Sequence, residues 1–361
     1  MKQLLPIVCA AVLACGCLKD DALNRPFTTY APVGIGDGHV LSDPASEGID
    51  PDALWNIYQD AYNDAALWPM RSLLVFRNGR LVAEAYPKDP DDITTRHLIW
   101  SATKQFTGVL SGIALEEGIL QDIDDPISMY FTTELDGHGD KAGITLRHLL
   151  NMRSGIAYEN DGIGGDTDEI LRQKPGNITD HILSLDMAAA PGDLFKYKDG
   201  DPQLLASVLQ KTLGRPMDEW AREVLLARIG ITNLNWVRYK DGTTLGGFGI
   251  ETTPREMAKL ALCVADSGRW NGQQVVPEAW IADMLTAHGT TSSGYGFGHQ
   301  WWIDTQRGIP FMSGHGGQFA FIVPYKRLLV VMTAFPNTQD AHQISATEAL
   351  TVVDRIIAAC D

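Results

Sequence analysis

The chain has 361 residues, of which 45% are hydrophobic and 20% charged, values that are ordinary for a folded globular protein. This length can bury a large core shared by two closely packed subdomains. The formal net charge of −16 at pH 7 argues against nucleic acids and anionic membrane surfaces as partners, because both would repel the chain.

The N-terminus, residues 1–17, has the pattern of an export signal. Lys2 precedes an apolar run, residues 4–13, which is too short to span a bilayer as a stable helix. The small residues and cysteines that follow resemble a bacterial lipoprotein signal, with Cys15 or Cys17 as the lipid acceptor. An ordinary cleaved secretory signal is the alternative. We therefore expect export, as a periplasmic or cell-surface lipoprotein or as a secreted protein, with membrane contact only through a lipid anchor.

Residues 18–47 are rich in Pro, Gly, Asp and Thr without periodicity, which predicts a linker. The expected catalytic body, residues 48–361, begins with a helix that starts at Asp50 and Pro51. Two apolar runs, 72–77 and 80–86, follow on either side of an Asn-Gly dipeptide, so this pattern predicts a β-hairpin.

Apolar residues recur at helical spacing over most of residues 101–240. Strand patterns return only near the C-terminus, and an amphipathic helix closes the chain. We therefore expect an α/β (α+β) fold, in which the two chain ends build one antiparallel sheet flanked by N- and C-terminal helices, with a large helical subdomain inserted. The expected late elements are a helix from Thr253, strands at 297–304, 318–323 and 328–335, and the helix at 345–360; the α/β part is expected at about 48–100 and 290–361, and the helical part at about 101–289.

Cys263 and Cys360 are the two cysteines outside the N-terminal segment. In an oxidising compartment they could form a disulfide. Both lie in apolar helical patterns, so two buried free thiols are the alternative. Neither is close in sequence to a grouping of His and Asp residues, and we do not expect a cysteine nucleophile.

Ser101 and Lys104 lie at an expected helix start, three residues apart and therefore on one helix face. A serine hydroxyl becomes a good nucleophile when a base takes its proton. A lysine can be that base at a buried helix N-terminus, because burial and the helix dipole both lower a lysine pKa. The alternative is a helix cap and a surface lysine, since roughly one Ser-x-x-Lys match is expected by chance in a chain of this composition.

A tyrosine could carry the proton between nucleophile and leaving group. Tyr197 is the leading candidate, because it follows a Pro-Gly turn and precedes a long amphipathic helix. Tyr239 repeats its Tyr-Lys-Asp-Gly string, and Tyr158 begins a literal Tyr-x-Asn that ends at Asn160. Tyr158 is the more serious competitor, and any of the three could instead be a core residue.

The third candidate segment is His315, Gly316 and Gly317, which precede an apolar strand. Glycines there let the backbone approach a ligand closely. The amide of Gln318, together with that of Ser101, would form a two-donor oxyanion hole, and His315 would contact the acyl or leaving group. A glycine-rich turn with a structural histidine is the alternative.

In this order, Ser101-x-x-Lys104, the Pro191-Gly-x-x-Phe-x-Tyr197 segment and His315-Gly-Gly resemble the motifs of the serine β-lactamase-like hydrolases. This family includes class C β-lactamases, D-alanyl-D-alanine peptidases, family VIII esterases and 6-aminohexanoate-oligomer hydrolases. The resemblance covers about residues 48–360 and implies a β-lactamase/transpeptidase-like fold without a metal or other cofactor. It also implies roles: Ser101 as the acylated nucleophile, Lys104 as its base partner, Tyr197 as the proton shuttle, and the amides of Ser101 and Gln318 as the oxyanion hole.

Two departures from the β-lactamase motifs bear on the substrate. Asp199 stands where those enzymes have Asn, and an ionised Asp cannot donate a hydrogen bond to a substrate amide. His315 replaces a permanent cation that would bind a substrate carboxylate. The expected substrate-binding residues are Asp199, His315, Gly316 and Gly317.

We therefore expect an esterase or amidase that acts on a small molecule or short peptide, with weak or absent β-lactam turnover. The nearest alternative is a D-amino-acid peptidase or a β-lactamase, acting on cell-wall-type or β-lactam substrates. The alternative of another class is a lipid-anchored binding protein that keeps the cleft without catalysis.

Overall fold

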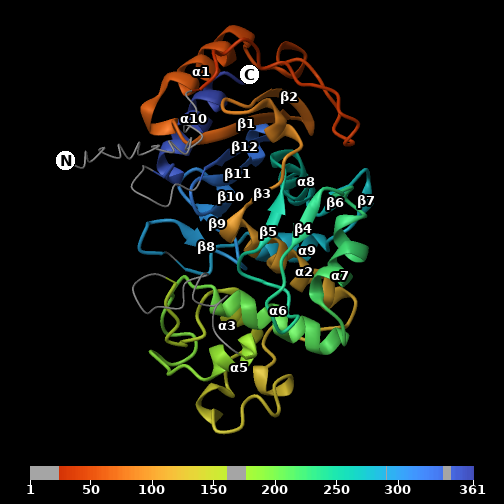
Figure 1. Cartoon of the computed structure of the whole chain (residues 1–361), viewed down its shortest axis with the longest axis vertical. Helices are drawn as coiled ribbons and strands as arrows, with labels where there is room; N and C mark the ends of the chain where they lie inside the picture. The colour runs from red at the N-terminus through yellow and green to blue at the C-terminus, as the bar shows by residue number, and fades with distance from the viewer. Residues whose placement is uncertain (1–23, 161–175, 290, 336–342) are drawn as a thin grey trace, which may run out of the picture.

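The computed structural model describes residues 24–160, 176–289, 291–335 and 343–361 (Figure 1). At its centre is a seven-stranded antiparallel sheet in the order β2-β1-β12-β11-β10-β9-β8. Its strands are β1 (Met70–Arg77), β2 (Arg80–Ala85), β8 (Gly296–Phe297), β9 (Trp302–Asp304), β10 (Ile309–Gly314), β11 (Gln318–Val323) and β12 (Leu328–Ala334).

The two ends of the chain meet in this sheet, as predicted. β1 pairs with β2 on one side and with β12 on the other, where Val75 lies opposite Val330. In Figure 1 the orange N-terminal hairpin lies beside the blue C-terminal strands. Asn78 and Gly79 join β1 to β2 with φ values of 53° and 77°, the left-handed backbone of a tight hairpin turn.

Helices cover both faces of the sheet. α1 and α10 share one core with Leu73 and Val75, whereas the neighbouring residues Leu74 and Phe76 of β1 point into a second core with α2, α6 and α8. Burial on both faces explains why these strands are continuous apolar runs instead of alternating ones. The helices are α1 (Pro51–Asn63), α2 (Thr103–Glu116), α3 (Leu146–Leu150), α5 (Ile178–Leu183), α6 (Gly200–Leu213), α7 (Met217–Ala221), α8 (Pro254–Ala265), α9 (Glu278–Met284) and α10 (Ala346–Ala358).

The part of the chain between the two halves of the sheet is mainly helical but also contains short strands. β3 (His97–Leu98), β5 (Ile250–Thr252) and β4 (Leu234–Trp236) form a small sheet, and β6 (Arg269–Trp270) pairs with β7 (Gln273–Gln274). α8, expected in the helical part, packs against β11 and β12 of the large sheet. The insertion therefore supplies one of the layers that cover the sheet.

The prediction of a single strand at 297–304 is wrong, because this segment contributes to two strands, β8 and β9, that pair with each other. Between them, Gln300 has a left-handed backbone with φ 64°. Its carbonyl accepts from Gln105 Nε2 of α2 at 2.6 Å, and its side chain donates to Leu150 O at 3.0 Å. These tertiary contacts hold a turn in a segment whose residues favour a strand by themselves.

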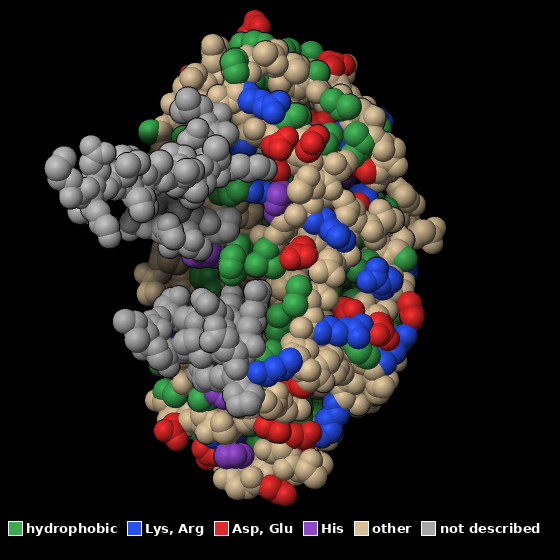
Figure 2. Space-filling view, in the orientation of Figure 1, with side chains coloured by type: hydrophobic (Ala, Val, Ile, Leu, Met, Phe, Trp, Pro, Cys, Tyr) green, Lys and Arg blue, Asp and Glu red, His purple; other side chains and the backbone are tan. Residues whose placement is uncertain are grey.

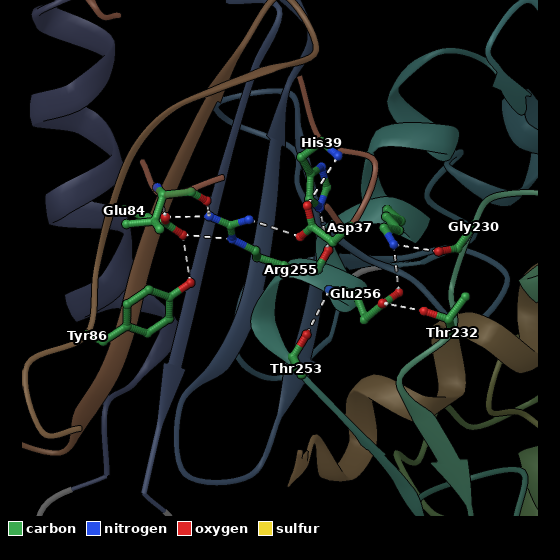
Figure 3. Close-up of polar contacts among 11 residues, drawn as sticks. Asp37, His39, Glu84, Tyr86, Gly230, Thr232, Thr253, Arg255 and Glu256 are labelled. Atoms are coloured by element: carbon green, nitrogen blue, oxygen red, sulfur yellow. Dashed lines mark hydrogen bonds and ion pairs between the residues drawn. The ribbon is translucent and has the colours of Figure 1, made fainter. Parts of the chain in front are cut away.

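Residues 24–47, part of the expected linker, lie along the edge of the sheet. Leu81 of β2 donates its amide to Val40 O at 2.9 Å, and Leu41 forms a parallel bridge with Leu81. Figure 3 shows the buried Arg255 of α8 contacting Glu84 of β2 and Asp37 of this segment. This ion-pair network joins the segment, the sheet and α8.

The two cysteines predicted to be either paired or free are both free and buried. Cys263 lies in the core that contains α8, and Cys360 lies in the core under α1 and α10, on the other face of the sheet. Within the described residues, no helix is both long enough and apolar enough to cross a membrane. The predicted signal segment with Cys15 and Cys17 lies outside the described residues.

Candidate active site

Ser101 lies in a single 3-10 turn, Trp100–Ala102, which runs directly into α2. Trp100 has φ 51°, a backbone conformation that residues with side chains rarely adopt. The turn is in close contact with the end of β10, since a Cβ atom on Gly314 would lie 2.1 Å from Ile99 O. Glycine at this position therefore permits the approach that brings the segment after β10 beside Ser101.

Lys104 is completely buried near the start of α2, one turn after Ser101, and its Nζ donates to Ser101 Oγ at 2.8 Å. Nζ also donates to Gly247 O at 2.8 Å and forms an ion pair with the carboxylate of Asp199. An ammonium group has three N–H donors, which match these three acceptors. A neutral amine in the same place would give its two N–H groups to Asp199 and Gly247 and direct its lone pair at Ser101 Oγ. These contacts thus orient the amine toward the hydroxyl in either protonation state.

Of the three candidate tyrosines, Tyr197 is the one that the structure places beside Lys104. The Lys104 Nζ lies 4.8 Å from the centre of the Tyr197 ring, which also packs against Trp302 at 5.2 Å between ring centres. Tyr158 and Tyr239 are instead buried in the larger core. The fold therefore places Tyr197 beside Lys104, while its role as the proton shuttle stays a prediction.

The loop that carries Tyr197 is held by buried polar contacts. Lys198 donates to Ile156 O at 3.0 Å, and Asp201 accepts from Ser154 Oγ at 2.6 Å. Burial raises the pKa of Asp201, an effect that the nearby Lys198 ammonium opposes. These residues fix the start of α6 and thereby the position of Tyr197.

Asn160, considered in the sequence only as part of a rival motif, belongs to the site. Its Oδ1 accepts from the backbone amide of Asp199 at 2.9 Å. Asn160 and Asp199 both line the cavity in front of Ser101. The Tyr-x-Asn string was the signal that could have identified Asn160. Sequence reasoning used it only to consider Tyr158 and missed the contact of the Asn160 side chain with Asp199.

The third motif reaches the same cavity. His315 is exposed, its ring meets that of Trp100 at 5.3 Å between centres, and its Nε2 lies 3.2 Å from Gln343 Nε2. Gly316 and Gly317 line the cavity as well. Gln318 begins β11 opposite Gly314. The side chain of Gln318 donates to Ala334 O at 2.6 Å and so supports the sheet, while the role of its amide in an oxyanion hole stays a prediction.

The cavity in front of Ser101 measures about 860 Å³, a volume suited to a small organic substrate. Its lining combines aromatic side chains with polar residues and glycines, and Asp199 is the only charged residue among the described residues that line it. Sequence reasoning missed Trp100, Trp302 and Phe319 as lining residues, because aromatic residues in apolar runs are more often core residues. The described lining consists of Trp100, Ser101, Asn160, Tyr197, Asp199, Trp302, Ser313, Gly314, His315, Gly316, Gly317, Phe319, Gln343, Ile344, Ser345 and Ala346.

A possible metal-ligand set lies elsewhere. Among the described residues, the group that could hold a metal ion is Asp283, His288 and His299, and none of these lines the cavity.

Figure 2 shows acidic and basic side chains interspersed over the visible face, without a continuous basic area.

The sheet built from both chain ends, the helical insertion and the contact of Ser101 with the buried Lys104 define a β-lactamase/transpeptidase-like fold. Residues 70–352 match the family model described as Beta-lactamase. The chain therefore belongs to the beta-lactamase family of hydrolases.

Three similar proteins share less than a quarter of their residues with this chain. The chain is 23% identical over 297 residues to the 6-aminohexanoate-dimer hydrolase of Paenarthrobacter ureafaciens, with 75% of this chain and 74% of the relative covered. A solved Bacillus anthracis protein, whose proposed name is also 6-aminohexanoate-dimer hydrolase, superimposes with a TM-score of 0.70 and 19% identity, covering 93% of this chain and 88% of its own. A family VIII carboxylesterase superimposes with a TM-score of 0.67 and 14% identity, covering 89% and 98%. The two structures bear on the fold alone.

Proposed function

We propose that this protein is a serine hydrolase that cleaves an ester or amide bond through an acyl-enzyme on Ser101. The observation that carries the proposal is the contact of 2.8 Å between Lys104 Nζ and Ser101 Oγ at the wall of a cavity of about 860 Å³. Burying an amine is costly unless the amine is paired, and the contacts of Lys104 with Asp199 and Gly247 stabilise it in an orientation that also directs it at Ser101 Oγ. The cavity supplies room for the substrate beside the hydroxyl.

In the proposed reaction, Ser101 Oγ attacks the substrate carbonyl carbon while its proton passes to the neutral amine of Lys104 or to a Tyr197 phenolate. The negative carbonyl oxygen is held by the amides of Ser101 and Gln318. Tyr197 then protonates the leaving alcohol or amine as the bond to the carbonyl carbon breaks. A water molecule releases the acid from Ser101 by the same steps in reverse order, which restores the serine.

The cavity favours a neutral substrate over a carboxylate. No Lys or Arg is among its described lining residues, and Asp199 would repel an anion. The names of the Paenarthrobacter ureafaciens relative and of the family VIII carboxylesterase support an amide or ester substrate. We therefore keep an esterase or amidase as the proposal, with β-lactams as poor substrates.

Export is a separate part of the proposal. The N-terminal pattern supports a lipid anchor on Cys15 or Cys17 in a periplasmic or surface protein. Metabolic labelling with a fatty acid, followed by mass spectrometry of the N-terminal peptide, would identify the modified cysteine. Recovery of unmodified protein in the cytoplasm would contradict the proposal of export, and it would leave the catalytic proposal unaffected.

The test of the catalytic proposal is a substrate panel combined with active-site labelling. Wild type is assayed with p-nitrophenyl esters, D-amino-acid amides, linear amide oligomers and nitrocefin, and it is treated with a fluorophosphonate. We expect turnover of an ester or amide, and labelling at Ser101. Ser101→Ala should lose the label and about 10⁴-fold or more of kcat/KM.

A matched control is Ser184→Ala, which removes an exposed hydroxyl that bonds only within its own helix end. This variant should keep both label and turnover. Efficient nitrocefin hydrolysis would favour the β-lactamase alternative, and preferred cleavage of D-amino-acid amides the peptidase. The absence of both label and turnover in folded wild type would indicate a binding protein.

A further inference from the structure

A second grouping of reactive side chains lies outside the catalytic cavity. Asp283 is in the last turn of α9, His288 is in the chain that leaves this helix, and His299 lies between β8 and β9. His299 is completely buried, while the side chains of Asp283 and His288 are 44% and 23% exposed. The group therefore has one completely buried member and one side that is open to water.

The three ligand atoms are close enough to share one ion. Asp283 Oδ2 lies 3.1 Å from His299 Nε2, and Asp283 Oδ1 lies 3.6 Å from His288 Nε2. One ligand atom from each residue falls within 4.8 Å of the others. Around a zinc ion, ligands at about 2.0–2.1 Å in a tetrahedron are roughly 3.3 Å apart, so small side-chain shifts would complete such a set.

The hydrogen bonds of the His299 ring point to the same conclusion. Asn151 Oδ1 lies 2.7 Å from His299 Nδ1, and in the tautomer that carries its proton on Nδ1 the Nε2 atom presents its lone pair to the Asp283 carboxylate. Two acceptors then face each other, and a cation between them would satisfy both. A hydrogen bond from the outer nitrogen of a histidine to a carbonyl-type oxygen is the usual support of a metal-bound ring.

His288 completes the set. Its Nε2 is shielded from water and has no hydrogen-bond partner among the described residues, although it faces the Asp283 carboxylate. The His288 ring stacks on that of His299, with centres 4.4 Å apart and planes at 18°. A shielded ring nitrogen without a donor or acceptor is costly unless it has a ligand.

The positive charge of Arg147 does not prevent a metal ion from binding to this group. Arg147 acts on His299 electrostatically, but its guanidinium is paired with Asp124 through contacts of 2.6 and 2.8 Å. That bidentate pair balances the Arg147 charge locally.

We propose that Asp283, His288 and His299 form a binding site for one divalent first-row transition-metal ion, such as Zn²⁺. Two imidazoles and one carboxylate suit such ions, and the exposed side leaves a position for water. Because none of the three lines the catalytic cavity, the ion has a structural role.

The role follows from what the site touches. The His299 ring stacks on Trp280 of α9 at 5.1 Å, and Trp280 Nε1 donates to Gly108 O of α2 at 3.0 Å. The ion would join α9 to the segment before β9 and would support α2, the helix that begins beside Ser101. Bound metal should therefore raise the unfolding temperature and leave the chemical step unchanged.

The experiment titrates the chelator-treated full-length protein with Zn²⁺ by calorimetry, and with Co²⁺ by absorption spectroscopy. We expect one ion per chain, a cobalt ligand-field spectrum, and a higher Tm with metal. Asp283→Asn and His288→Ala should each weaken binding by about tenfold or more and remove the metal-dependent rise in Tm. Both positions are partly exposed, so these variants should fold, which circular dichroism would verify.

His138→Ala is the matched control, because His138 is a partly exposed histidine far from this group in sequence. It should bind metal as wild type does. The proposal is overturned if folded wild type binds no ion, or if both site variants keep the stoichiometry, affinity and Tm rise of wild type.

Discussion

Lys104 shows how one residue's surroundings set its chemistry. Its amine is enclosed by protein and faces a hydroxyl, a carbonyl and a carboxylate. The carbonyl and the carboxylate can only accept, so they hold the amine in one orientation. The carboxylate of Asp199 also favours the charged form of the amine, which is the form that cannot act as a base.

A first prediction concerns this carboxylate. Asp199→Asn keeps an acceptor for Lys104 but removes the negative charge, so the amine should lose its proton at a lower pH than in wild type. Because the base works when deprotonated, the acidic limb of the kcat/KM profile should move to lower pH by about one unit or more. Ester hydrolysis measured from pH 5 to 10 checks this.

Asp193→Asn is the control, since Asp193 is exposed on the same loop and should leave the profile in place. An acidic limb that does not move in Asp199→Asn would show that the group titrating there is not coupled to Asp199. A gain of nitrocefin turnover in this variant would further support the argument that Asp199 disfavours β-lactams.

At the scale of elements, the site depends on the contact between the end of β10 and the turn that holds Ser101. One is the end of an inner strand of the sheet, and the other is the turn that begins a helix. Their distance is set by Gly314, where any Cβ would overlap Ile99 O and lie 3.2 Å from the amide nitrogen of Ala102. The cavity wall and the nucleophile are thus coupled through the backbone.

A second prediction follows for Gly314→Ala. The added methyl group should push β10 from the turn, destabilise the fold by about 1–3 kcal/mol and lower kcat more than it raises KM. Urea unfolding and steady-state kinetics measure both effects.

Gly143→Ala is the matched control, because a Cβ at Gly143 would meet nothing within 4 Å. It should change neither quantity appreciably. Wild-type kcat in Gly314→Ala would mean that the close approach is not required for catalysis.

At the scale of the whole molecule, contacts between distant parts of the chain hold the sheet to the segments around it. Arg255 of α8 is 1% exposed and donates to Glu84 of β2, to Asp37 and to Val33 O (Figure 3). Arg255 belongs to the insertion, and its partners come from the N-terminal segment and the hairpin. The network therefore ties together three regions that separate on unfolding.

The third prediction is that Arg255→Gln lowers the free energy of unfolding by about 3–5 kcal/mol, since it leaves Glu84 buried without its cation. Arg355→Gln removes an exposed pair with Asp60 instead and should cost about 1 kcal/mol or less. Urea titration of wild type and the two variants gives both values. Equal losses of unfolding free energy in the two variants would contradict the argument that the Arg255 network stabilises the fold.

The fourth prediction concerns the two thiols, which lie on opposite faces of the sheet. Burial raises the pKa of Cys263 to about 12 and also raises that of Cys360. The thiolate is the reactive form, so both thiols should resist iodoacetamide at pH 8 and react once urea unfolds the chain. Peptide mapping checks this. A peptide pair joined by a Cys263–Cys360 disulfide would contradict the arrangement of the two cores.

Local chemistry made part of the fold readable from the sequence. The Asn78-Gly79 turn, the capped helices and the apolar runs at both ends predicted the hairpin, the terminal helices and the sheet that joins them. Each of these depends on neighbouring residues, whose backbone preferences and periodicity a sequence displays directly. The spacing of Ser101 and Lys104 is of the same kind, because one helical turn brings them together.

The tertiary structure alone decided which tyrosine meets Lys104, that Asp199 pairs with it, and that 297–304 turns at Gln300. It also separated Cys263 from Cys360 and brought Asp283, His288 and His299 together. Most of the deciding partners are distant along the chain, and the three possible metal ligands meet through the turn before β9, so no local pattern encodes these contacts. Packing of the two cores against one sheet sets those distances, and with them the chemistry that the side chains can perform.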